Sequence, residues 1–181
     1  MSNNESEWLR AAQEGSEESF TYLIEKYQTP VYNMCYRMLG NAGDAEDAAQ
    51  ETFWRAYQAI KRYDPSRSFI TWLLSIAAHY CIDQQRRRRL PTLDLDILPD
   101  EDVPDFAPNP EQTYGKVEET ESMQRLLSNL SPQDRAAIVL RYWYDFSEEE
   151  ISQSLSKSVS AVKSRLFRAR RQLAEIFYQV A

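Results

Sequence analysis

The sequence predicts an all-α protein made of two small helical domains joined by an acidic, proline-rich linker, the second domain being a helix-turn-helix. Apolar residues recur at helical spacing along most of the 181 residues. Alternating segments bounded by turn residues are scarce, and the chain has only four glycines, so strands are not expected. The formal net charge is −7, but the charge is distributed very unevenly.

The first domain is expected to span residues 1–90. A short helix is predicted over Ser6–Ala12, followed by a long apolar pattern from Phe20 to Met38 that closes at Gly40. Pro30 lies inside this pattern and should kink or split the helix, because its ring clashes with the preceding turn.

A third and a fourth helix are expected to complete this domain. Asp44 can cap the third, and Tyr63–Ser66 has the composition of a turn. The fourth runs from Phe69 into four consecutive arginines at positions 86–89. An apolar helix thus ends in a cluster of cations.

Residues 91–115 are predicted to form the linker, since they hold five of the eight prolines. Residues 91–121 contain ten acidic residues and one lysine, a net charge of −9, which leaves +2 for the rest of the chain. At full extension 25 residues reach on the order of 80 Å, so the two domains could lie far apart.

Residues 116–181 are expected to form the second domain. Ser131 and Pro132 begin one helix, and Ser147 with Glu150 forms a capping box that begins the next. A turn is expected near residues 156–158. The helix that follows it is amphipathic and basic, because residues 157–171 include six cations and no acid.

A basic helix after such a turn has the width of the DNA major groove, which predicts a DNA-contacting helix. The candidate contacts are Lys163, Ser164, Arg165 and Arg168. The alternative is an ordinary solvated basic helix, which the turn and the capped preceding helix make less attractive.

The residues that enzymes use are few. We expect Cys35 and Cys81 to be buried reduced thiols, since no CxxC spacing occurs and His79 is the only histidine. No glycine-rich phosphate loop, metal cluster or nucleophile–base pair stands at diagnostic spacing, so neither an enzyme nor a cofactor is predicted. The polar N-terminus and the lack of a spanning apolar run predict a cytoplasmic protein without membrane insertion.

Two segments of the first domain resemble the second conserved region of the sigma-70 family. These are DAEDAAQETFWRAY at 44–57 and YDPSRSFITWLLSIAAHYCID at 63–83. Together with SAVKSRLFRAR at 160–170, they resemble the extracytoplasmic-function (ECF) group, which keeps only two of the sigma domains.

The resemblance implies that an acidic helix docks on the clamp coiled coil of the beta prime subunit of core RNA polymerase, with the beta subunit as a further partner. Exposed carboxylates and an amide at helical spacing can pair with cations on a partner helix. The alternative is a solvated acidic face. The residues concerned are Asp47, Gln50, Glu51 and Trp54.

The resemblance also assigns promoter melting and minus-ten recognition to the first domain. Aromatic rings can stack on unpaired bases, although the spacing of Trp72 equally suits a core position. His79 stands where the family more often has Asn, and the arginines could be general phosphate contacts. The melting residues are Tyr63, Phe69, Thr71 and Trp72, and those at the minus-ten element are His79, Asp83, Arg86 and Arg87.

Minus-thirty-five recognition is assigned to the basic helix, in which Ser160 and Ala161 replace the usual Gly-Thr pair of the family. The resemblance also implies that the acidic linker runs near the RNA exit path of the polymerase. The residues that match the recognition helix are Lys163, Ser164, Arg165, Phe167 and Arg168.

These patterns favour a dissociable initiation factor that binds core polymerase, directs it to promoter DNA and helps to melt the start site. The resemblance to the ECF group further implies an anti-sigma factor as an expected partner. A stand-alone helix-turn-helix regulator would leave the acidic helix and the Trp72 region unused. A helical hydrolase or adaptor with incidental basic helices is the other alternative.

Overall fold

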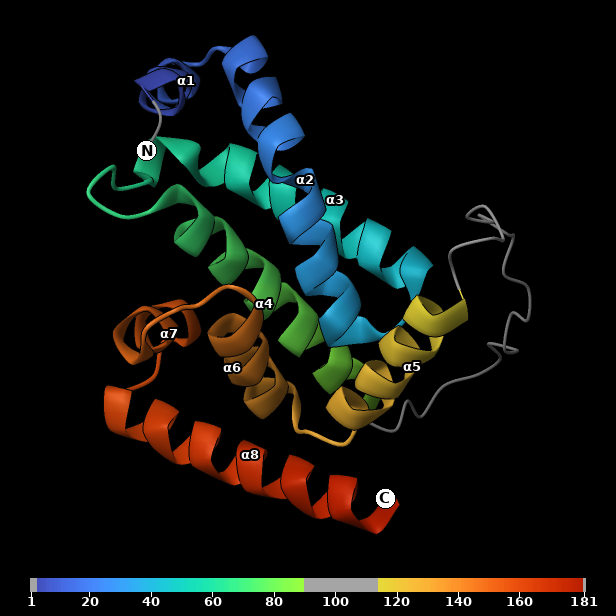
Figure 1. The fold of residues 1–181 in the computed structure, drawn as a ribbon. Helices are drawn as coiled ribbons and strands as arrows, with labels where there is room; N and C mark the ends of the chain where they lie inside the picture. The colour runs from blue at the N-terminus through green and yellow to red at the C-terminus, as the bar shows by residue number, and fades with distance from the viewer. Residues whose placement is uncertain (1–2, 90–113, 181) are drawn as a thin grey trace.

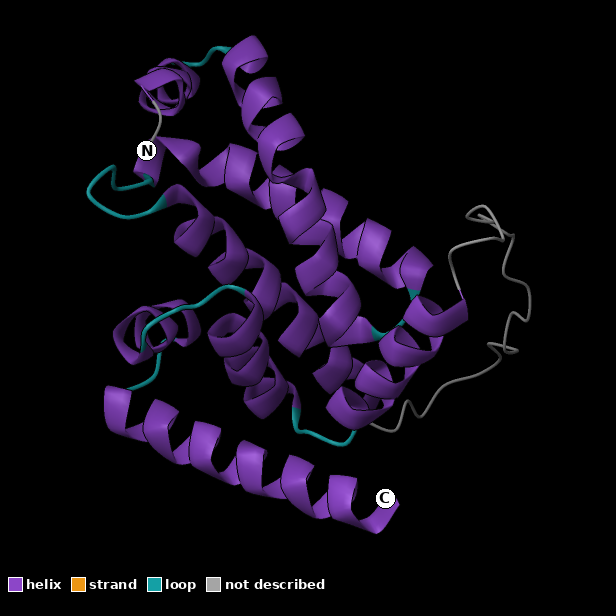
Figure 2. Cartoon of the chain, in the orientation of Figure 1, coloured by secondary structure: helices purple, strands orange, loops and turns teal. Residues whose placement is uncertain are grey.

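The computed structural model describes residues 3–89 and 114–180, and within these ranges the chain is helical with no strand (Figure 2). The all-α prediction is therefore confirmed. The elements are α1 (Asn3–Gln13), α2 (Glu17–Leu39), α3 (Ala42–Ala59), the 3₁₀ turn η1 (Ile60–Arg62), α4 (Phe69–Arg89), α5 (Tyr114–Ser128), α6 (Pro132–Trp143), α7 (Glu148–Leu155) and α8 (Val159–Val180).

The first four helices pack around a shared apolar core (Figure 1). Ser16 caps α2, and Gly40 ends it with a φ of 76°, a left-handed conformation that glycine adopts without strain. Pro30 lies inside one continuous helix, so the predicted split does not occur.

The start of α3 differs from the prediction. Asn41 is the N-cap, and its side-chain oxygen accepts a hydrogen bond from the Asp44 backbone N–H at 2.9 Å. Asp44 lies in the first helical turn instead, where its carboxylate accepts two hydrogen bonds from Arg88 at 2.7 and 2.8 Å. The guanidinium of Arg88 lowers the pKa of Asp44. The prediction that Asp44 caps this helix was therefore wrong.

The second group of helices contains the helix-turn-helix. Ser147 and Glu150 form the predicted capping box, and Ser131 caps α6. Ser156 adopts a left-handed φ of 52° in the turn between α7 and α8. Of the predicted linker, 91–115, only the last two residues lie within the described ranges, and they begin α5. The domain boundaries stay a prediction.

The two groups of helices pack against each other rather than standing apart. In Figure 1, α4 lies between α2 and α3 on one side and α6 and α7 on the other, and both sides contact it. Polar contacts also join the groups. The buried Arg135 donates to the Met38 carbonyl, and the Tyr144 hydroxyl donates to the Pro30 carbonyl at 2.6 Å.

Cys35 and Cys81 are fully buried free thiols, as predicted. They come from α2 and α4, and a hydrogen bond between the two thiols, together with burial, raises the pKa of Cys81. A raised pKa lowers the thiolate fraction, so Cys81 is unreactive while the core is closed.

Candidate nucleic-acid interface

The loop before α4 is anchored by two buried rings. Tyr63 is 3% exposed and Phe69 is 1% exposed, and their ring centroids lie 5.3 Å apart. Burial is the largest effect that raises the pKa of Tyr63 to about 12, and its hydroxyl donates to the Arg67 carbonyl at 2.5 Å. In this arrangement neither ring is presented to DNA. The exposed part of the loop is the tip between them, residues 64–68.

Thr71 and Trp72 follow on the first turn of α4, and both are half-buried. The Trp72 ring lies 5.1 Å from the Tyr63 ring, so part of it belongs to the core. With Gln153 and Ser154 of α7 the two residues line a hollow of about 30 Å³, which shows that α7 covers this part of α4.

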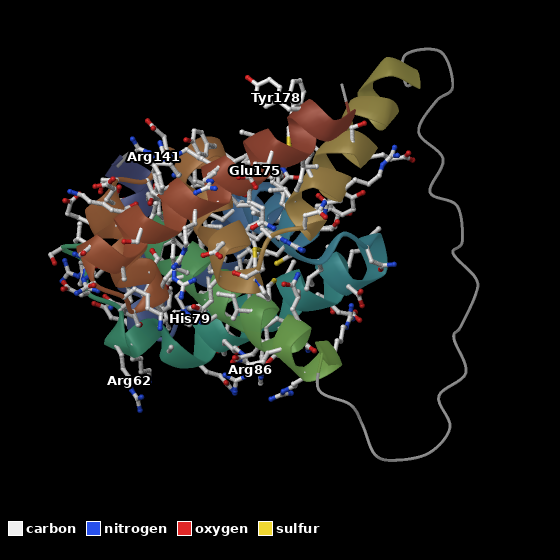
Figure 3. All side chains as sticks on the ribbon, turned by 90° about the horizontal axis from the view of Figure 1, so that it is seen from below. Arg62, His79, Arg86, Arg141, Glu175 and Tyr178 are labelled. Atoms are coloured by element: carbon white, nitrogen blue, oxygen red, sulfur yellow. The ribbon has the colours of Figure 1, made fainter. Side chains whose placement is uncertain are left out.

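The second half of α4 carries an exposed polar stripe. His79, Asp83, Arg86 and Arg87 are all exposed, and their spacing places them on one side of the helix. The His79 ring nitrogen Nδ1 lies 2.8 Å from the Ser75 carbonyl. Figure 3 shows His79 and Arg86 toward the same side of the molecule as Arg62, away from Arg141 and Tyr178.

Sequence reasoning missed three exposed cations near this stripe, Lys61, Arg62 and Arg67. The first two end η1 and the third lies at the tip of the loop before α4. The sequence signal that could have identified them is the basic pair Lys61 and Arg62 directly before Tyr63. These residues extend the positive surface from the end of α4 to its beginning, so it can follow a phosphate backbone.

Four of the five predicted minus-thirty-five residues lie exposed on α8: Lys163, Ser164, Phe167 and Arg168. Phe167 is 63% exposed, so its ring is available to a partner. Lys163 forms a partly exposed ion pair with Glu148 at 3.4 Å. This pair is a weak contact that DNA can replace.

Arg165 differs from the other four residues. Its guanidinium nitrogen Nη1 lies 2.8 Å from the Asp134 carboxylate of α6, and the two side chains are 21% and 16% exposed. The Asp134 carboxylate also accepts a hydrogen bond from the Ser131 hydroxyl at 2.7 Å. Arg165 therefore joins α8 to the start of α6 in this arrangement.

A separate acidic face lies on α3. Asp47, Gln50, Glu51 and Trp54 line one hollow of about 450 Å³ together with Tyr80 of α4. Trp54 is 57% exposed. Glu51 forms an ion pair with Arg55 at 2.7 Å, and the Arg55 guanidinium lies 4.8 Å from the centre of the Tyr80 ring. The four predicted docking residues thus share one open face.

Neither a metal site nor a membrane span is found in the part of the chain that the structure describes. No three His, Cys, Asp or Glu side chains there are placed to hold a metal ion. None of the described helices combines the length and the apolar character that crossing a bilayer requires.

A helix-turn-helix with an exposed basic helix, next to a helical body with its own basic stripe and acidic face, defines a DNA-binding transcription factor. Comparison with known families identifies it further. Residues 23–90 match the family described as Sigma-70 region 2, and residues 120–173 match Sigma-70, region 4. The chain belongs to the sigma-70 family.

Individual relatives place it within the ECF group. The chain is 33% identical over 172 residues to the ECF RNA polymerase sigma factor SigW of Bacillus subtilis, an alignment that covers 91% of this chain and 92% of SigW. A stand-alone regulator is not favoured, because the chain matches both sigma regions.

Two solved structures share the fold. CnrH, solved in complex with the cytosolic domain of CnrY, is 23% identical with a TM-score of 0.74, over 99% of this chain and 100% of CnrH. The sigma factor RpoE of Bartonella quintana, solved with the anti-sigma factor NepR, is 20% identical with a TM-score of 0.65, over 89% of this chain and 98% of RpoE.

Proposed function

We propose that this chain works as a dissociable initiation factor: it binds core RNA polymerase, directs it to a two-part promoter and assists melting of the start site. The observation that carries this proposal is the presence, in one chain, of an acidic docking face on α3 and two separate basic surfaces on α4 and α8. We infer no covalent chemistry for it, since docking and DNA binding account for these surfaces.

Core binding is assigned to the α3 face. Asp47, Gln50 and Glu51 offer carboxylate and amide oxygens to cations of the beta prime clamp, while Trp54 supplies an exposed ring at the same hollow. The beta subunit stays a predicted second contact.

DNA contacts are assigned by exposure. On α4 the stripe formed by His79, Asp83, Arg86 and Arg87 is open to a minus-ten element. The loop tip 64–68 and, once α7 moves aside, Thr71 and Trp72 are the candidates for holding an unpaired strand. We place Tyr63 and Phe69 beneath this surface, as the rings that support it.

On α8 we assign Lys163, Ser164, Phe167 and Arg168 to the minus-thirty-five element, since all four are exposed. Arg165 is assigned there only in a state in which it releases Asp134.

We further propose an anti-sigma factor as a partner, because RpoE of Bartonella quintana, which has the same fold, was solved with one. Capture of the tagged chain from unstressed cells should then recover a second protein together with, or in place of, polymerase. Recovery of polymerase alone would count against this partner.

The main experiment combines the purified chain with core polymerase of its host and sequences the 5′ ends of transcripts from fragmented genomic DNA. Discrete starts that share a two-part upstream motif are expected. An active core that gives no such starts would contradict the proposal.

The docking assignment has its own control. Charge reversal at Asp47 and Glu51 should abolish the starts, whereas the same reversal at Glu7 and Glu25, which are exposed on α1 and α2, should leave them unchanged. Equal loss in both variants would contradict the assignment.

A further inference from the structure

Helix α1 is firmly fixed to the body of the first helical group. Leu9 and Ala12 are each 3% exposed, and Glu5 is buried, where it accepts hydrogen bonds from Lys26 and from the Tyr27 hydroxyl, the latter at 2.8 Å. Burial alone would raise the pKa of Glu5, but the two hydrogen bonds and nearby positive charge, chiefly that of Lys26, together outweigh it and the pKa is lowered. All of α1 precedes residues 23–90, so the region 2 match assigns it no role.

Gln13, the last residue of α1, reaches the loop that leads into α4. Its amide nitrogen Nε2 donates to the Ile60 carbonyl at 3.1 Å and to the Tyr63 carbonyl at 2.8 Å. A side-chain amide has two N–H donors, and both are used here. Because both partners are carbonyl oxygens, only the nitrogen of the amide can face them. Gln13 therefore fixes the backbone at the start of the loop.

The rest of the loop is closed by its own contacts. The Tyr63 hydroxyl donates to the Arg67 carbonyl, and the Ser66 backbone N–H donates to the Asp64 carboxylate at 2.9 Å. Residues 64–68 between these contacts are exposed. The position of this tip thus depends on the Tyr63 backbone, and one of the groups that hold that backbone is the Gln13 amide.

We propose that Gln13 is a positioning residue for capture of the melted promoter strand. It touches no nucleotide, but it holds the loop so that the tip residues 64–68 meet an unpaired base on the surface they share with the start of α4. This proposal rests on the proposed initiation function and adds α1 to the strand-binding apparatus. If the backbone at the start of this exposed loop is no longer held, the loop must become ordered when DNA binds, which weakens binding.

The test compares Gln13→Met, which has similar length but no donors, with Gln13→Arg, which restores N–H donors to the two carbonyls. Gln58→Met, a substitution of an exposed glutamine on α3, is the matched control. Each full-length variant is assembled with core polymerase. The probes are a single-stranded non-template oligonucleotide and an upstream duplex, both taken from the strongest start found with the wild-type protein.

Gln13→Met is expected to weaken binding of the single strand on the order of 10-fold, the effect of two lost hydrogen bonds, with the duplex and core affinities unchanged. Gln13→Arg should recover most of the loss, and Gln58→Met should show none. Unchanged single-strand affinity in Gln13→Met, or an equal loss of all three affinities, would overturn the proposal.

If Gln13→Met does not give the helical circular dichroism of the wild type, Gln13→Ala is measured in its place and the same criteria apply. If the wild-type protein directs no initiation at all, the proposed function fails. If the wild-type holoenzyme initiates normally and Gln13→Met binds the single strand as tightly as the wild type, the proposed function stands and only the role of Gln13 is removed.

Discussion

The two basic regions, α4 with its preceding loop and α8, use aromatic and charged residues in opposite ways. Around α4 the rings of Tyr63 and Phe69 are buried, whereas Arg86 and Arg87 are exposed and have no ion-pair partner among the described residues. On α8 the ring of Phe167 is exposed, whereas Arg165 is held by Asp134.

This difference shows that the type of a residue does not by itself determine its role. Rings that were predicted to bind an unpaired strand are buried beneath the surface, and an arginine that was predicted to contact DNA joins two helices. The cluster of cations that ends α4 shows the same difference. Arg88 donates hydrogen bonds to Asp44, whereas its neighbours Arg86 and Arg87 are exposed.

The largest expected effect comes from replacing the aromatic residues Phe69 and Phe167, one at a time, by alanine. Phe69→Ala should lower the free energy of unfolding by about 3–5 kcal/mol, because it empties a fully buried site. Phe167→Ala should change it by less than about 0.5 kcal/mol, yet weaken binding to the upstream promoter duplex. Urea unfolding of the two variants checks the comparison, and similar losses in both would contradict it.

A smaller loss of stability is expected when the ion pair between α8 and α6 is broken. Arg165→Met leaves the partly buried Asp134 carboxylate without its cation and should cost about 2–3 kcal/mol of unfolding free energy. Lys163→Met, which removes a more exposed pair, should cost less than about 0.5 kcal/mol. Thermal or urea unfolding distinguishes the two, and a stability of Arg165→Met equal to that of the wild type would show that the pair is unimportant.

Salt dependence should distinguish arginines that bind phosphate from arginines that bind the protein. Replacing Arg87 or Arg168 by Ala should each reduce the slope of log affinity against log salt concentration by about 0.9. Arg88→Ala should leave the slope closer to that of the wild type, because Asp44 already binds this side chain. Holoenzyme binding to promoter DNA at a series of salt concentrations provides the slopes, and three equal reductions would contradict the distinction.

The smallest expected effect is a pH-dependent one at Asp44. Arg88 lowers the pKa of Asp44 below its ordinary value of 3.8, so the pair stabilises the fold above pH 3.8 and its contribution is lost as the pH falls through the lowered pKa. The Arg88 side chain is 55% exposed, which limits the contribution to about 0.5 kcal/mol.

Asp44→Asn should therefore be slightly less stable than the wild type at pH 7 and equally stable well below pH 3.8. Unfolding measured at both pH values checks this expectation. A difference that persists at low pH would assign the effect of the substitution to something other than the charge.

Local features of the fold could be predicted from the sequence. The capping box at Ser147 and Glu150 and the turn at Ser156 are confirmed, because each involves residues a few positions apart. The start of α3 was misassigned, since Asn41 and Asp44 are both good capping residues and spacing alone does not choose between them.

Long-range contacts could not be predicted. Arg165 and Asp134 are 31 positions apart, and no periodicity of α8 indicates a partner on α6. The half-buried state of Trp72 and the depth of Tyr63 depend on how η1 directs the chain into α4, which is decided by packing against α1 and α7. The composition of the linker also does not predict that the second helical group packs against the first.

Because α7 covers Thr71 and Trp72, its position affects the affinity that the isolated chain shows for a promoter strand. A promoter strand that uses these residues must displace α7, so strand and helix compete for one surface. The observed affinity of the isolated chain is then its intrinsic affinity multiplied by the fraction of molecules already open, and a population of about 1% open would weaken it about 100-fold. A polymerase that holds the two helical groups apart removes this factor, so the strand is bound at full affinity only after the holoenzyme has assembled.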